Sequence, residues 1–84
     1  QENPSDTNFN FYPNPSKGGT LNFEFNKEKG YRHIKIYDSN GSLQKQENVT
    51  GKTDYSMSLD LAPGIYFVNL YTSNNSEIRK LVIW

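Results

Sequence analysis

Turn-forming residues interrupt this sequence about every ten residues, and the segments between them alternate apolar and polar side chains. The clearest case is residues 20–25, where Leu21, Phe23 and Phe25 share one parity. A period of two is typical of a half-buried β-strand, because successive side chains of a strand point to opposite faces. No segment has the period of an amphipathic helix. The pattern therefore predicts an all-β chain folded as an antiparallel sandwich of about seven strands.

The expected strands differ in how they should lie in the sheets. They cover residues 9–12, 20–25, 31–38, 42–49, 55–61, 64–72 and 77–84. The strand 64–72 is apolar on both parities, which predicts a central position with Tyr66, Val68 and Leu70 in the core. The strand 42–49 is polar, with Leu43 and Val49 in phase, and is expected at an edge, where its charges oppose edge-to-edge pairing.

The turns between these strands carry the residues that such turns require. Pro13 and Pro15 fix φ and lack an N–H, so the first strand must end before them. Asn40-Gly41 is a strong hairpin signal between two strands. Gly64 follows Ala62-Pro63, where we expect a backbone angle that a side chain would strain.

Length and composition restrict the classes of protein to which the chain can belong. Its 84 residues are enough for one domain. We interpret residues 1–8, which contain no large apolar side chain, as a flexible linker from a preceding segment, and residues 9–84 as the domain. The 9 basic and 9 acidic residues cancel, so the basic footprint of a nucleic-acid-binding domain is missing. The absence of Cys excludes disulfides, thiolate catalysis and thiolate metal sites.

The sequence offers no constellation for catalysis, and we predict no enzyme, metal ion or cofactor. The single histidine, His33, falls on the parity opposite Ile34 and Ile36 and is expected to face solvent. Residues 38–42 (DSNGS) begin like a calcium loop, but an EF-hand loop needs Gly at position six and a bidentate Glu at position twelve. Here Gly41 is fourth and Val49 is twelfth, so a hairpin turn is the better interpretation.

Aromatic side chains offer an alternative function. Exposed rings on a β-sandwich can stack on sugars, as in a carbohydrate-binding module. The candidates for such a platform are Tyr37, Tyr55, Phe67, Tyr71 and Trp84. The competing interpretation, that these rings cover a thin core, is favoured because large rings supply the apolar area that a short chain lacks.

Four segments, in order, resemble the motifs of type A C-terminal sorting domains of the type IX (Por) secretion system. The first is Phe11-Tyr12-Pro13-Asn14-Pro15, followed by glycine and Leu21. The others are the hairpin of residues 34–41, the segment 59–68 (LDLAPGIYFV) and the closing residues 80–83 (KLVI). The match extends over residues 9–84, with the four motifs in the expected order.

This resemblance implies an immunoglobulin-like sandwich that directs an attached cargo protein through the outer-membrane type IX translocon of a Gram-negative bacterium. It implies two partners, the translocon and a sortase-like surface protease that cuts in or before residues 1–8. The cargo would pass through the periplasm and be anchored at the cell surface or released. The alternative is a non-catalytic carbohydrate-binding or spacer module of a secreted enzyme. An unpaired edge strand would also allow a homodimer.

The resemblance also selects residues for recognition by the translocon. They are Pro13, Asn14, Pro15, Gly64, Tyr66, Lys80, Leu81, Val82, Ile83 and Trp84. The family commonly ends on Lys or Arg, whereas this chain ends on Trp84, which is expected either to pack on the fold or to join the recognition surface. We expect residues 80–84 to form a last strand with a free edge, open to strand addition.

Overall fold

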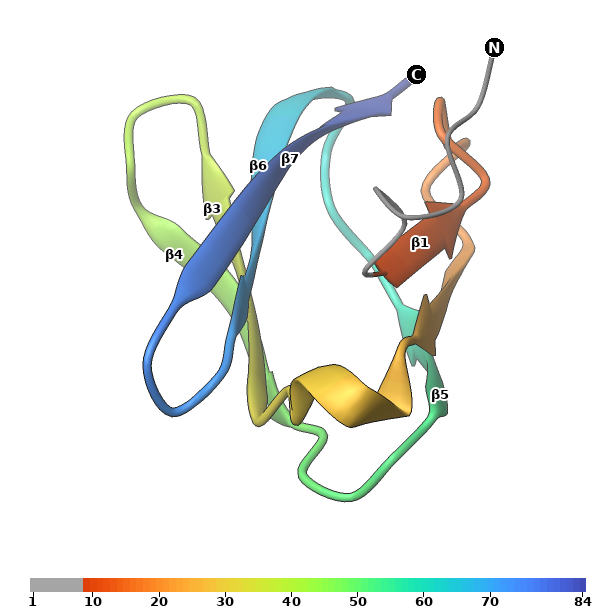
Figure 1. Cartoon of the computed structure of the whole chain (residues 1–84). Coiled ribbons are helices and arrows are strands. Elements are labelled where there is room, and N and C mark those ends of the chain that lie inside the picture. The colour runs from red at the N-terminus through yellow and green to blue at the C-terminus, as the bar shows by residue number, and fades with distance from the viewer. Residues whose placement is uncertain (1–8) are drawn as a thin grey trace, which may run out of the picture.

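The computed structural model describes residues 9–84, which form two antiparallel sheets (Figure 1). The first sheet has the order β1-β2-β5 and the second the order β4-β3-β6-β7. The strands are β1 (Phe9–Tyr12), β2 (Thr20–Phe25), β3 (His33–Asp38), β4 (Leu43–Asn48), β5 (Asp54–Ser58), β6 (Gly64–Tyr71) and β7 (Ser76–Ile83). The prediction of an all-β sandwich of seven strands is confirmed. Residues 1–8, where the linker is predicted, lie outside the described part.

The core lies between the two sheets and follows the alternation of the sequence. In β2, every second residue is buried, and in β6 the buried residues are Tyr66, Val68 and Leu70, as predicted. β6 pairs with β3 on one side and β7 on the other, which confirms its central position. The fully or nearly fully buried apolar side chains are Phe9, Leu21, Phe23, Phe25, Tyr31, Ile34, Ile36, Val49, Met57, Leu59, Tyr66, Val68, Leu70, Leu81 and Ile83.

Aromatic rings fill the core beside β1. Phe9 packs edge-on against Tyr31, with 5.7 Å between ring centroids, and Phe25 lies 5.9 Å from the same ring. Tyr31 belongs to the connection that follows a single 3-10 turn, η2 (Lys27–Lys29), which crosses between the sheets at the bottom of Figure 1. Large rings thus supply much of the apolar area buried in this part of the core.

The β3–β4 hairpin corrects one detail of the sequence pattern. β4 is an edge strand, as expected. However, the pairing shifts by one residue between Ile36 and Tyr37, so Leu43 lies opposite Tyr37 on the outer face. Leu43 is exposed whereas Val49 is buried, so the two side chains do not face the same way. An irregularity of this kind reverses the face of every residue beyond it, and the period of two cannot reveal it.

Candidate functional site

The last strand contributes both core and surface to the site selected by the sequence. Leu81 and Ile83 are buried in the core, whereas Lys80 and Trp84 are exposed and Val82 is half-buried between them. Side chains of alternate residues on a strand point to opposite faces. Residues 80, 82 and 84 therefore share the outer face, and Trp84 is 68% exposed at the chain end.

The segment that follows β1 lies against the outer edge of this strand. The Asn14 side chain donates from Nδ2 to the Lys80 carbonyl oxygen at 2.9 Å and accepts the Val82 N–H on Oδ1 at 3.0 Å. Ser16 continues the contact with its backbone, in an isolated parallel bridge opposite Ile83. Its N–H donates to the Val82 carbonyl and its carbonyl accepts from the Trp84 N–H, both at 2.8 Å.

These contacts correct the expectation of a free edge. Four backbone groups of residues 80–84 are bonded to Asn14 and Ser16, so this part of β7 is already paired. Ser16 is fully buried there, and its Oγ accepts the N–H of Gly18 at 3.0 Å. Sequence analysis missed Ser16, because a serine between a proline and a lysine in a turn carries no local sign of burial.

Gly64 and Tyr66 support the same end of the sandwich from β6. Gly64 pairs with Ile83 and has a φ of +156°, which L side chains rarely adopt, so the predicted need for glycine is confirmed. Tyr66 pairs with Leu81, and its buried ring places the hydroxyl 2.6 Å from the Ala62 carbonyl oxygen, to which it donates. The structure thus gathers all the sequence-selected residues around the end of β7.

The comparison with known proteins agrees with this arrangement. The family model of the secretion system C-terminal sorting domain matches residues 10–84, nearly the whole chain. This chain belongs to that family. No curated protein matches it. The resemblance of the four motifs is confirmed, and the domain is the sorting signal of a type IX cargo protein that is destined for secretion or the cell surface.

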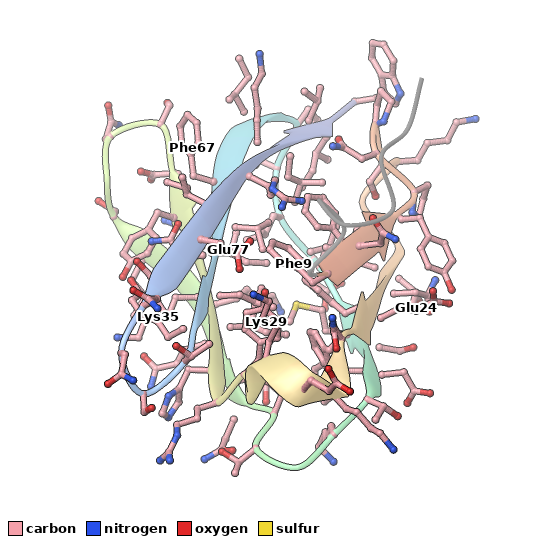
Figure 2. All side chains as sticks on the ribbon, viewed as in Figure 1. Phe9, Glu24, Lys29, Lys35, Phe67 and Glu77 are labelled. Atoms are coloured by element: carbon pink, nitrogen blue, oxygen red, sulfur yellow. The ribbon has the colours of Figure 1, made fainter. Side chains whose placement is uncertain are left out.

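The sorting domain is also held together by a polar cluster that sequence analysis missed. Tyr31 donates from its hydroxyl to Glu77 Oε2 at 2.6 Å, and Arg79 Nη2 lies 3.4 Å from Glu77 Oε1. The Arg79 guanidinium sits 4.5 Å from the centroid of the Phe9 ring, so it links β7 to β1 across the two sheets. Figure 2 shows Phe9 and Glu77 in the space between them. Burial, and then the bond to Glu77, raise the pKa of the Tyr31 hydroxyl well above 10.0.

The aromatic residues of the sorting domain do not form one flat platform. Phe67 and Tyr37 line a shallow hollow of about 320 Å³ on the outer face of the four-stranded sheet, together with Asn69 and Ile78. Figure 2 shows Phe67 on this outer side. Tyr55 belongs to the other sheet and packs against the core, and Trp84 stands at the chain end. Tyr71 lies beside Tyr37, with their hydroxyl oxygens 3.4 Å apart. Three of the five candidate rings thus share the outer face of the four-stranded sheet, whereas Tyr55 and Trp84 lie elsewhere, so the predicted five-ring platform is not formed.

The two residues considered for metal binding or acid–base chemistry, Asp38 and His33, have other roles: Asp38 stabilises the hairpin turn, and His33 lies on the outer face of a strand. Asp38 Oδ1 accepts the N–H groups of Asn40 and Ser42, both at 2.9 Å, and its Oδ2 accepts from Gln44 at 3.0 Å. The carboxylate therefore closes the hairpin predicted at Asn40-Gly41. Within residues 9–84, no group of three or more His, Cys, Asp or Glu is placed to hold a metal. His33 is half-buried on the outer face of β3.

No helix among residues 9–84 has the length and hydropathy needed to cross a membrane.

Proposed function

We propose that the type IX translocon contacts this sorting domain at the C-terminal end of β7, through the outer-face side chains of Lys80, Val82 and Trp84. The observation that carries the proposal is the four-bond contact of Asn14 and Ser16 with this end. It brings two segments that are far apart in the sequence together at the end of β7, beside the exposed side chains of Lys80 and Trp84. A receptor that must recognise many cargo proteins needs a contact surface that belongs to the signal itself.

The remaining sequence-selected residues act through the fold. Leu81, Ile83 and Tyr66 are buried, so a receptor cannot touch them without unfolding the domain. Gly64 holds the turn into β6. The segment Pro13–Pro15 positions Asn14 against the strand edge. These residues act on the surface indirectly, and their substitution should impair export only as far as it unfolds β7.

The order of events that we propose is the one that membership of the family implies. The cargo reaches the periplasm, the translocon binds the end of β7, and the cargo then crosses the outer membrane. A surface protease of the sortase-like type then cuts in or before residues 1–8. These residues contain no large apolar side chain, which suits a site that must be extended in a protease cleft. The sorting domain itself takes no part in catalysis.

A secretion assay tests the contact surface. A periplasm-directed fluorescent reporter is fused ahead of residues 1–84 in a bacterium that has a type IX system, and surface-exposed reporter is measured. Replacing Lys80→Ala and Trp84→Ala together removes the two most exposed contacts. Truncation of a hot-spot residue costs about 2 kcal/mol or more, and Trp is enriched among hot spots, so surface reporter should fall about tenfold or more and collect in the periplasm.

The matched control is Lys52→Ala, which removes an exposed lysine from the connection between β4 and β5. This connection lies at the end of the sandwich opposite the C-terminus (Figure 1). Both variants should keep the β-sheet circular dichroism of the parent chain. The proposal fails if the Lys80→Ala/Trp84→Ala variant is exported at the parental level. It also fails if the Lys52→Ala variant loses as much surface reporter as the double variant does.

A further inference from the structure

The outer edge of β7 is complementary to an extended peptide strand. In an antiparallel pair, alternate residues of each strand turn their N–H and C=O groups away from the partner. In β7 the outward groups near the C-terminus are the Lys80 carbonyl, both groups of Val82 and the Trp84 N–H. A strand laid along this edge would find two donors and two acceptors in regular order.

The segment Asn14–Ser16 occupies these groups as an imitation of such a strand. The Asn14 amide offers one donor and one acceptor, as a peptide unit does, and bonds Lys80 and Val82. Ser16 supplies a true backbone pair, and its bridge to Ile83 is parallel. The ladder does not extend beyond this bridge, since β1 ends at Tyr12 and pairs with β2.

The contact is held mainly by hydrogen bonds rather than by apolar packing. Pro13, Asn14, Pro15 and Lys17 are all exposed, and Ser16 alone is buried. A competing strand that donates to the Lys80 and Val82 carbonyls and accepts from the Val82 and Trp84 N–H groups replaces these bonds one for one. Such an exchange has a small net cost, because each lost bond is regained with the new partner.

We propose that Asn14–Ser16 is a displaceable latch over a strand-pairing site formed by residues 80–84, and that the partner is an extended peptide segment of the secretion machinery. This segment takes the place of the latch and runs parallel to β7, as Ser16 does. The inference rests on the proposed function. The latch also has a use before export, because it covers an edge that would otherwise pair with other chains.

A disulfide that holds the latch shut is the direct test. The chain has no cysteine, so Ser16→Cys with Ile83→Cys creates one defined pair at positions that face each other in the parallel bridge. The reporter fusion with both cysteines should form the bond in the oxidising periplasm and remain there. The two single-cysteine chains each carry one of the two packing changes without the bond and should be exported. Reductant should restore export of the double variant, which carries both changes.

The converse test loosens the latch by Asn14→Ala, with Asn10→Ala as the control, an exposed asparagine of β1. Amide exchange of Val82 should accelerate about tenfold or more, while Leu81, whose N–H faces β6, stays protected. Export of the Asn14 variant should equal or exceed that of the parent chain.

Three results would overturn the latch. The first is export of the double variant with its disulfide intact, as judged by mobility on non-reducing gels. The second is failure of the purified, oxidised double variant to form the disulfide, which would show that residues 16 and 83 do not face each other as the bridge requires. The third is loss of export in Asn14→Ala while Leu81 remains protected. If the parent fusion is not exported at all, the proposed function fails instead, and the outcome is distinguishable from these three.

Discussion

The hydrogen bond between Tyr31 and Glu77 should contribute measurably to stability, because it joins a buried hydroxyl to a carboxylate. Tyr31 is 4% exposed, and its hydroxyl lies 2.6 Å from Glu77 Oε2. Tyr31→Phe keeps the ring and its contacts with Phe9 and Phe25 but deletes the donor. The substitution therefore isolates the hydrogen bond from the packing.

The expected loss follows from the surroundings of the carboxylate. Hydrogen bonds to charged groups contribute about 1.5–3 kcal/mol. The Glu77 side chain is 27% exposed and has Arg79 within 3.4 Å, so water and Arg79 compensate in part. We expect a loss at the lower end, about 1.5–2 kcal/mol. For a domain of this size, that loss lowers Tm by roughly 6–16 °C.

Urea unfolding at pH 7, followed by far-UV circular dichroism, measures the loss. Fluorescence is a poorer probe, because Trp84 is exposed at the chain end. The matched control is Tyr12→Phe. Tyr12 also donates to a carboxylate, Glu24 Oε2 at 3.0 Å, but is 46% exposed, so Tyr12→Phe should lower the free energy of unfolding much less than Tyr31→Phe does.

Two results would refute this reasoning. Tyr31→Phe could unfold within about 0.5 kcal/mol of the parent chain, in which case the buried bond contributes nothing net. Alternatively, Tyr12→Phe could cost as much as Tyr31→Phe, and burial would then not determine the strength of a tyrosine–carboxylate bond in this domain.

Three further predictions concern stability. Burial and Glu77 raise the pKa of the Tyr31 hydroxyl above 10.0, so the unfolded chain loses this proton at a lower pH than the folded chain does. The free energy of unfolding should therefore fall as the pH rises above 10.0. In urea titrations at each pH, this fall should be less steep for Tyr31→Phe. Gly64→Ala should cost about 1–2 kcal/mol in urea titrations because of its φ of +156°, whereas Gly19→Ala, with no atom within 4 Å, should be nearly neutral. Leu81→Ala should cost about 2–5 kcal/mol and Ile78→Ala, 60% exposed on the same strand, less than about 0.5 kcal/mol in the same assay.

Local pattern was sufficient to predict most of the fold. Strand positions, the central place of β6 and the edge position of β4 follow from which residues are apolar and at what spacing. The same pattern failed at Leu43, because the pairing shift after Ile36 depends on how two strands meet. It also gave no sign of the Tyr31–Glu77–Arg79 cluster, whose members each look like ordinary surface or strand residues.

For the candidate site, sequence alone determined which segments matter: the prolines after β1, the glycine before β6 and the closing strand carry motifs that name the family. Only the tertiary structure decided what Asn14 and Ser16 do. Asn14 bonds to Lys80 and Val82, which lie 66 and 68 residues further along the chain, and Ser16 bonds to Val82 and Trp84. The physical reason is that strand formation depends on side-chain spacing within a few residues. The pairing of a strand edge depends on which distant backbone groups the finished sandwich brings within hydrogen-bonding distance.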